Sequence, residues 1–248
     1  MLPGVDPEKV LFVDIETVSQ HPEYKLVPEA AKPLWQQKGA WFARQNNLEW
    51  NDETASSTYQ DKAAIYAEFG KVLVVSVGYL RSVDGMYHLK LKSFADKDER
   101  VVLEGFSKLL KNYYKPGVNY LCGHNIKEFD VPYVCRRLVI NGMPLPEMIN
   151  VVGKKPWETQ QLLDTMTLWK FGDFKNFTSL NLLAHVLGIP TPKDDIDGSM
   201  VGRVFWEEND IERIRVYCEK DVATSARVLL RLMGKGTIED ANIESASA

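Results

Sequence analysis

The chain has 248 residues, of which 45% are hydrophobic and 26% are charged, and it carries a formal net charge of −4 with a pI near 5.7. This balance excludes a bulk polycation, so any binding to nucleic acid has to rely on local basic groups or on metal ions. The length and the apolar content suffice to bury a large core as one domain, and no apolar run approaches the length of a membrane-spanning helix.

The cysteines indicate a reducing compartment. Cys122, Cys135 and Cys218 are odd in number and lack the CxxC spacing of metal or redox motifs. The first ten residues have neither the basic start nor the apolar centre of a signal peptide. We therefore expect a cytoplasmic protein with no membrane partner.

The first predicted element is a strand that begins with residues 10–13, VLFV, an apolar run typical of a strand buried on both faces. Residues 18–68 follow as a polar, aromatic-rich insertion, which is too long for a plain connection, so we predict helices at 28–35 and 61–69. Its aromatic side chains fit either a packed cluster or a nucleic-acid path, and we favour packing.

The rest of the chain alternates strand and helix patterns. Strands at 71–80 and 87–94 form a predicted hairpin across the turn Val83-Asp84-Gly85. Further strands are predicted at 118–123 and 162–168, and helices at 96–114, 129–141, 180–187 and 209–233, the last with a break near Asp221. This order predicts an α/β fold, a mixed sheet of about five strands with helices on both faces. We expect one domain over residues 1–233 and a disordered tail over 234–248.

Two carboxylates follow the first strand. Because strand side chains alternate, Asp14 and Glu16 lie on the same side of the strand. Two unpaired charges at a buried position are costly, so a divalent metal ion is expected there. The alternative is a strand that simply ends in solvent, and other acid-x-acid pairs in this chain, such as Asp96 and Asp98, lie in segments that read as polar.

Two later motifs offer partners for this pair. Asp130 stands at a strand-to-helix junction, the usual place for functional groups in α/β folds, although a carboxylate also favours a helix N-terminus for its own sake. Tyr217 and Asp221 are four residues apart, so a continuous helix places them on one face. That pair suits a carboxylate that binds a metal and a phenol that orients its water; a half-buried tyrosine beside a solvent-facing acid is the other reading.

Taken in order, these motifs resemble the three exonuclease motifs of the DEDD superfamily in its tyrosine-bearing branch. Residues 12–17 (FVDIET) and 125–133 (NIKEFDVPY) are similar to the proofreading domain of family B DNA polymerases. Residues 179–193, 195–199 (DIDGS) and 217–222 (YCEKDV) resemble the stand-alone predicted exonucleases related to that domain. The resemblance spans about residues 10–233.

This resemblance implies an RNase H-like fold and a 3′→5′ exonuclease that uses two divalent ions, Mg²⁺ or Mn²⁺. Such ions, roughly 3.5–4 Å apart, stabilise both the attacking and the leaving oxygen of phosphodiester hydrolysis. We expect Asp14 to bridge the two ions, Glu16 and Asp221 to complete the nucleophile-side site, and Asp130 to hold the second ion. Tyr217 is expected to orient the attacking water.

The substrate contacts rest on weaker signals. We expect Thr17 to meet the terminal nucleotide, Asn125 to hydrogen-bond the strand, and Phe129 either to stack on a base or to pack in the core. Asp164, a fifth acid at a strand end, is interpreted as a residue with a structural hydrogen bond.

The favoured substrate is single-stranded DNA or the frayed 3′ end of a duplex. RNA is the alternative within the enzyme class, and a non-catalytic nucleic-acid-binding module is the alternative outside it. A phosphatase with an aspartyl nucleophile requires Asp-x-Asp on the first strand, which Glu16 does not provide. The residues do not separate proofreading, DNA repair and trimming, nor do they identify a polymerase or repair partner or an oligomeric state.

Overall fold

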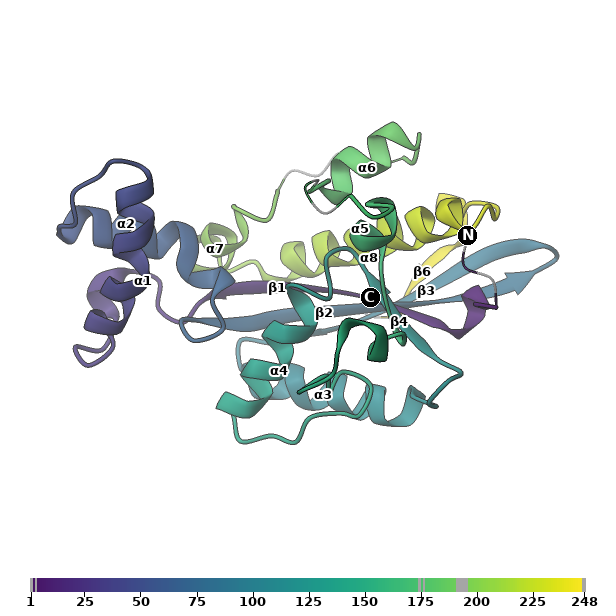
Figure 1. Cartoon of the computed structure of the whole chain (residues 1–248), viewed down its shortest axis with the longest axis horizontal. Helices are drawn as coiled ribbons and strands as arrows, with labels where there is room; N and C mark the ends of the chain where they lie inside the picture. The colour runs from purple at the N-terminus through teal and green to yellow at the C-terminus, as the bar shows by residue number, and fades with distance from the viewer. Residues whose placement is uncertain (1, 3, 174, 176, 191–195, 247–248) are drawn as a thin grey trace.

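The computed structural model describes residues 2, 4–173, 175, 177–190 and 196–246, and they form a six-stranded mixed sheet in the order β5-β4-β1-β2-β3-β6 (Figure 1). Within it β1 pairs antiparallel with β2 and β2 with β3, whereas the β1–β4, β4–β5 and β3–β6 pairs are parallel. The strands are β1 (Val10–Ser19), β2 (Gly70–Val83), β3 (Met86–Ala95), β4 (Tyr120–Gly123), β5 (Leu162–Asp164) and β6 (Ile243–Ser245). The α/β prediction with a mixed sheet is confirmed, and the strand beyond the expected five is β6.

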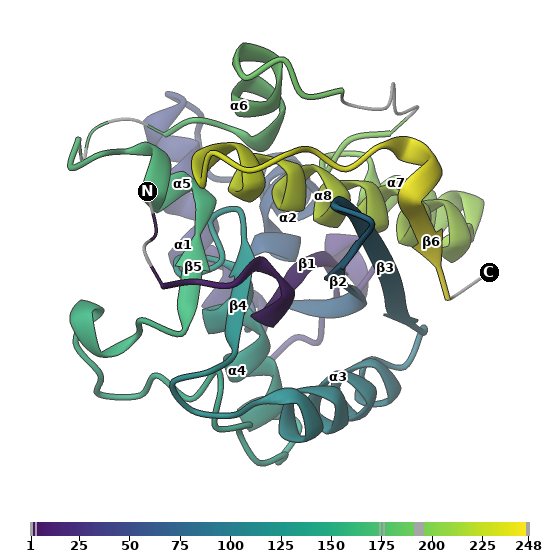
Figure 2. The ribbon, with the colours of Figure 1, turned by 90° about the vertical axis from the view of Figure 1, so that its right-hand side faces the viewer.

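Helices cover both faces of the sheet (Figure 2). One face carries α3 and α4, and the other carries the long helix α8. None of the helices among the described residues is both long and apolar enough to cross a membrane. The α-helices are α1 (Lys32–Gln45), α2 (Asp52–Lys62), α3 (Glu99–Tyr113), α4 (Asp130–Ile140), α5 (Thr165–Trp169), α6 (Leu180–Val186), α7 (Val201–Arg203) and α8 (Ile211–Leu232).

The alternation of β1 divides the core between these two faces. Leu11, Val13 and Ile15 pack with α3 and α4, whereas Val10 and Phe12 pack with α8. All five side chains are buried, as the apolar start of the strand predicts. Since Asp14 and Glu16 continue the even-numbered series, they emerge on the α8 face.

The segment between β1 and β2 forms a small helical lobe beyond the end of these two strands, at the left of Figure 1. Trp35 and Tyr59 are fully buried in its centre and meet edge to face, with ring centroids 5.2 Å apart. The packing interpretation of its aromatic residues is confirmed for this pair. The predicted helix bounds were wrong: the helices are α1 and α2, and Asn51, whose side chain caps α2, supplies a start signal that was missed.

Three further predictions differ from the structure. The strand predicted over 162–168 ends at Asp164, because the Asp164 side chain caps α5 and starts a helix there. Helix α8 runs through Asp221 without a break. The tail predicted to be disordered is ordered over 234–246, where Ile238 is buried and β6 pairs with β3; residues 247–248 lie outside the described residues.

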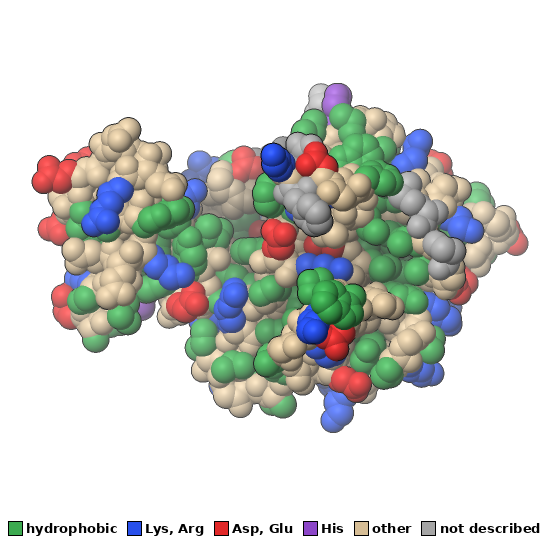
Figure 3. Space-filling model, viewed as in Figure 1, with side chains coloured by type: hydrophobic (Ala, Val, Ile, Leu, Met, Phe, Trp, Pro, Cys, Tyr) green, Lys and Arg blue, Asp and Glu red, His purple; other side chains and the backbone are tan. Residues whose placement is uncertain are grey.

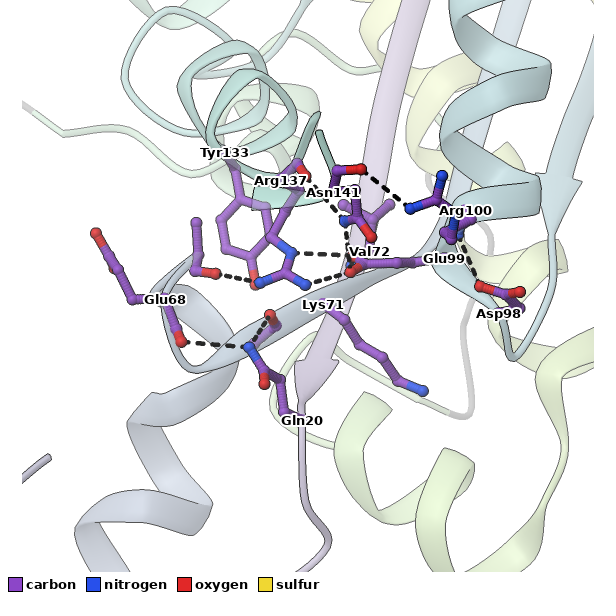
Figure 4. A network of polar contacts seen from close by, with 12 residues as sticks. Gln20, Glu68, Lys71, Val72, Asp98, Glu99, Arg100, Tyr133, Arg137 and Asn141 are labelled. Carbon is purple, nitrogen blue, oxygen red and sulfur yellow. Dashed lines mark hydrogen bonds and ion pairs between the residues drawn. The ribbon is translucent and has the colours of Figure 1, made fainter. Parts of the chain in front are cut away.

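A buried ion pair joins the two helices that cover the α3–α4 face (Figure 4). The Arg137 guanidinium on α4 binds both oxygens of Glu99 on α3 and also donates to the Ala67 carbonyl, 2.7 Å away, at the base of the helical lobe. Glu99 in turn accepts from the Val72 backbone N–H on β2 at 3.2 Å. This network fixes α3, α4, β2 and the lobe relative to one another.

Candidate active site

The two acids of β1 lie next to α8. Asp14 is opposite Ser76 of β2, and Glu16 is opposite Val74. The β1–β2 register shifts directly after Glu16, an irregularity of the kind often found beside active sites. Glu16 is buried and Asp14 is half-buried, so neither simply ends in solvent.

Helix α8 brings the third motif to these acids. The Tyr217 side chain hydrogen-bonds with Asp221 one turn further along, as the four-residue spacing predicts. Cys218 follows Tyr217 in the sequence, and its buried thiol lies 3.3 Å from an Asp14 carboxylate oxygen and donates to it. The continuous helix therefore sets Asp221 and Tyr217 beside Asp14 and Glu16.

Asp130 reaches the same place around the edge of β1. Strand β4 pairs with the β1 residues Val10, Leu11 and Phe12, so its pairing covers the first part of β1 and stops before Asp14. Gly123 ends β4 so close to β1 that a Cβ there would lie 2.4 Å from the Val13 carbonyl oxygen. The chain then crosses to Asp130, the first residue of α4. Burial raises the pKa of its carboxylate, and a hydrogen bond with the Ile15 backbone acts in the opposite direction.

The four carboxylates lie near enough to one another to interact electrostatically. Burial raises the pKa of Asp14 well above its usual value, and the charges of Asp221, Asp130 and Glu16 raise it further. The pKa of Glu16 is raised by burial and then by Asp221 and Asp130. Burial, with Asp164 and Asp221, raises the pKa of Asp130 to about 7. Such mutual repulsion is relieved by a bound cation.

The donor set suits a hard divalent ion. Ligand atoms of Asp14, Glu16 and Cys218 all lie within 4.8 Å of one another. Burial, followed by the charges of Asp14 and Glu16, raises the pKa of the Cys218 thiol well above its usual value, and the thiol donates its hydrogen bond to Asp14. The carboxylate oxygens are left as ligands, and these suit Mg²⁺ and Mn²⁺.

The three residues predicted to contact the substrate, Thr17, Asn125 and Phe129, have different surroundings in the structure. The Thr17 hydroxyl donates to the Ala64 carbonyl, 2.9 Å away, and so ties β1 to the lobe. Phe129 packs against Tyr133, with ring centroids 5.4 Å apart, and against the core of the α3–α4 face, which fits the packing alternative. Asn125 has a left-handed backbone, with φ 66°, and its side-chain oxygen is buried with no hydrogen-bond partner among the described residues.

Asp164 organises the loop that leads to Asp130. Its buried carboxylate accepts backbone N–H groups of Asn125 at 3.1 Å and Lys127 at 3.0 Å, besides two in the first turn of α5. His124, at the start of the same loop, contacts the Thr165 hydroxyl and the Thr178 carbonyl through its two ring nitrogens. The structural interpretation of Asp164 is confirmed.

We expect Asp164→Asn to lower the free energy of unfolding by about 2–3 kcal/mol, because an amide removes the charge and turns an N–H toward one of the backbone donors. Urea denaturation measures the change. The matched control is Asp98→Asn, since Asp98 is an exposed cap of α3 that asparagine replaces equally well. Equal stability of the two variants would contradict this role for Asp164.

The raised pKa values also predict how stability depends on pH. The folded protein keeps protons on these acids to a higher pH than the unfolded chain, in which an aspartate titrates near ~4. Metal-free protein therefore loses stability as the pH rises from about 4 to the Asp130 pKa of about 7. Thermal unfolding in a chelator should show this loss, and Mg²⁺ should raise the Tm more at pH 8 than at pH 6. A rise in Tm with Mg²⁺ that is equal at pH 6 and pH 8 would contradict this prediction.

Sequence reasoning missed Cys218 and the Glu99–Arg137 pair. For Cys218 a signal exists, because helical spacing from Ile214 and Val222 puts it on the face that packs on the sheet. For Glu99 and Arg137 we find none, since each stands in an ordinary amphipathic helix and they meet only in the folded chain.

The sequence matches the model of one protein family. Residues 65–247 match the sequence model of a family described as predicted 3′-5′ exonuclease related to the exonuclease domain of PolB. The matched range contains Asp130, Tyr217 and Asp221, whereas Asp14 and Glu16 precede it. The mixed sheet flanked by helices is consistent with the RNase H-like fold of such exonucleases. No curated protein matches the chain.

Proposed function

The chain belongs to the family of predicted 3′-5′ exonucleases related to the exonuclease domain of PolB, and from this premise we propose that it removes nucleotides from the 3′ end of single-stranded or frayed DNA with two divalent metal ions. The observation that carries the proposal is the convergence of Asp14, Glu16, Asp130 and Asp221, from three separate elements, where burial and the neighbouring acidic charges raise the pKa of the first three. Buried carboxylates gathered in this way are typical of functional sites.

We assign the four carboxylates to two neighbouring metal sites. Asp14, in the middle of the group, would hold both ions; Glu16 and Asp221 would complete one site, and Asp130 the other. When bound, Mg²⁺ or Mn²⁺ would supply a nucleophile at neutral pH and offset the charge on the departing 3′ oxygen. Cys218 donates its hydrogen bond to Asp14 and so fixes the orientation of that carboxylate.

Tyr217 acts as a positioning group rather than as a base. Burial, followed by the charges of Asp221, Glu16 and Asp14, raises its pKa far above the usual value for tyrosine. The phenol therefore stays protonated over the working pH range, and it orients water by hydrogen bonding without taking its proton.

A labelled oligonucleotide tests the proposal. With Mg²⁺ or Mn²⁺, a 5′-labelled single strand should give a ladder that shortens from the 3′ end, and a chelator should stop it. Circular single-stranded DNA should stay intact, because it has no 3′ end. An RNA strand of the same sequence, tested in parallel, separates a deoxyribonuclease from an exoribonuclease.

An oligonucleotide that survives both metals at every pH from 7 to 9 would overturn the proposal. Tight binding of the intact strand under the same conditions would then identify a non-catalytic nucleic-acid-binding module.

A further inference from the structure

The segment that follows α5 carries two phenylalanine rings that lie largely in solvent. Phe171 is 66% exposed and Phe177 is 70% exposed. The residues 170–177, KFGDFKNF, hold two lysines and one aspartate, so the segment is basic in a chain whose net charge is −4. Exposed aromatic side chains combined with cationic groups are the combination by which proteins bind single-stranded nucleic acid.

Phe171 has a strained backbone conformation and buries little of its side chain. It stands just after the end of α5 with φ 45°, the left-handed position that glycine usually fills at a helix C-terminus. Its ring meets Trp169 edge to face, at 6.2 Å between centroids, and is otherwise exposed. A side chain that costs backbone strain and buries little points to a function outside folding.

Phe177 is held by a cation on one face. The Lys170 ammonium lies 4.5 Å from the centroid of the Phe177 ring, and the Lys170 side chain is itself buried. The same ammonium is 4.0 Å from a Glu128 carboxylate oxygen. Lys170 therefore supports the ring from one side, while the exposed remainder of the ring can accept a flat partner.

Two contacts place this segment beside the candidate active site. Lys170 reaches Glu128, and the Thr178 carbonyl lies 2.8 Å from His124 Nε2. Glu128 and His124 belong to the loop over residues 124–129, which ends at Asp130. In the space-filling view, the surface is recessed between the α1–α2 lobe and the rest of the molecule (Figure 3), and the end of β1 that carries Asp14 and Glu16 runs toward that lobe (Figure 1).

We propose that Phe171 and Phe177 form a stacking platform for unpaired bases of the strand whose 3′ end occupies the carboxylate site. The inference rests on the proposed function and adds a second binding region to it. Stacking on aromatic side chains tolerates any base, which suits an enzyme that advances along a strand one nucleotide at a time. It also requires little net positive charge, in agreement with the acidic composition of the chain.

Binding measurements on matched variants test the platform. Fluorescence anisotropy gives the Kd for a 5′-labelled 12-nucleotide strand of DNA, with Ca²⁺ in place of Mg²⁺ to prevent turnover, and an RNA strand of the same sequence forms a second arm. Phe171→Gly and Phe177→Ala should each raise the Kd about fivefold or more, the lower end of base stacking on one ring. Phe177→Trp keeps an aromatic ring at this position, so its Kd should equal that of the unmodified protein. The Kd of a labelled dinucleotide, which reaches only the carboxylates, should stay unchanged.

Stability separates this role from a structural one. Phe171→Gly removes the strained backbone, so the Tm should be equal to or higher than that of the unmodified protein while binding weakens. The control is Tyr79→Ala, because Tyr79 on β2 is another exposed ring beside a cation, 36% exposed with the Arg81 guanidinium 5.6 Å from its centroid. Tyr79 pairs with Leu11 near the start of β1, three residues before Asp14. Tyr79→Ala should leave the Kd unchanged.

If both phenylalanine variants bind with a Kd within twofold of that of the unmodified protein and still shorten DNA, the platform is overturned and the proposed function stays intact. Unmodified protein that neither binds nor shortens any strand would overturn both. Weaker binding in Tyr79→Ala equal to that of the phenylalanine variants would also overturn the platform.

Discussion

Replacing Asp14 by asparagine is expected to lower the rate of strand shortening by at least about a thousandfold, and at the same time to stabilise the metal-free protein. The rate falls because Asp14 would hold both ions, and metal-ion stabilisation of the transition state is worth several kcal/mol, each ~1.4 kcal/mol of which is tenfold in rate. The stability rises because the pKa of Asp14 is raised by burial and then by all three of its acidic neighbours. Opposite signs for activity and stability are typical of a functional residue.

Strand shortening and thermal unfolding in a chelator measure the two effects on one preparation. The control is Asp84→Asn, since Asp84 lies exposed in the β2–β3 turn with φ 52°, a conformation that asparagine also adopts. This variant should retain full activity and an unchanged Tm. An Asp14→Asn protein that is inactive and also less stable would show that Asp14 supports the fold rather than a metal.

Replacing Arg137 by methionine is expected to lower the free energy of unfolding by about 3–5 kcal/mol, the usual cost of breaking a buried ion pair. The substitution leaves the Glu99 carboxylate buried without its cation and the Ala67 carbonyl without its donor. Because the pair joins α3 to α4, and α4 begins with Asp130, we also expect weaker stabilisation of the protein by Mg²⁺. Urea denaturation with and without Mg²⁺ measures both quantities.

Arg100→Met is the matched control, because Arg100 is an exposed arginine on α3 that donates to the Asn141 carbonyl in the same region (Figure 4). It should change stability by no more than about 0.5 kcal/mol. The double variant Arg137→Met with Glu99→Gln removes the stranded charge and should recover part of the loss. A loss in Arg137→Met no greater than that in Arg100→Met would refute the anchoring role.

Much of the fold followed from local patterns. The apolar start of β1 predicted a strand buried on both faces, because such a run has no face to give to water. The four-residue spacing of Tyr217 and Asp221 predicted that they share one face of a helix, because a helix turns once in 3.6 residues. Both features depend only on residues near in the chain, and both are confirmed.

The errors arose where distant segments decide the outcome. Residues 234–246 are polar and small in sequence, and they are ordered because Arg227 on α8 donates to the Ile238 carbonyl and β3 offers an edge to β6. The end of β5 at Asp164 likewise reflects a side chain shared between the start of α5 and the 124–129 loop. Neither partner is visible in the local sequence.

The sequence by itself indicated which residues would carry the proposed chemistry: the acids Asp14, Glu16, Asp130 and Asp221, with Tyr217, were predicted from residue type, spacing and the resemblance to the DEDD motifs. Only the tertiary structure decided how they are held. The Cys218 thiol on Asp14, the Asp164 carboxylate under the loop, the Glu99–Arg137 pair and the outward rings of Phe171 and Phe177 all depend on contacts between segments far apart in sequence or on a backbone conformation that no residue type specifies. The reason is physical: periodicity fixes the direction of a side chain relative to its own strand or helix, whereas packing fixes what that side chain meets.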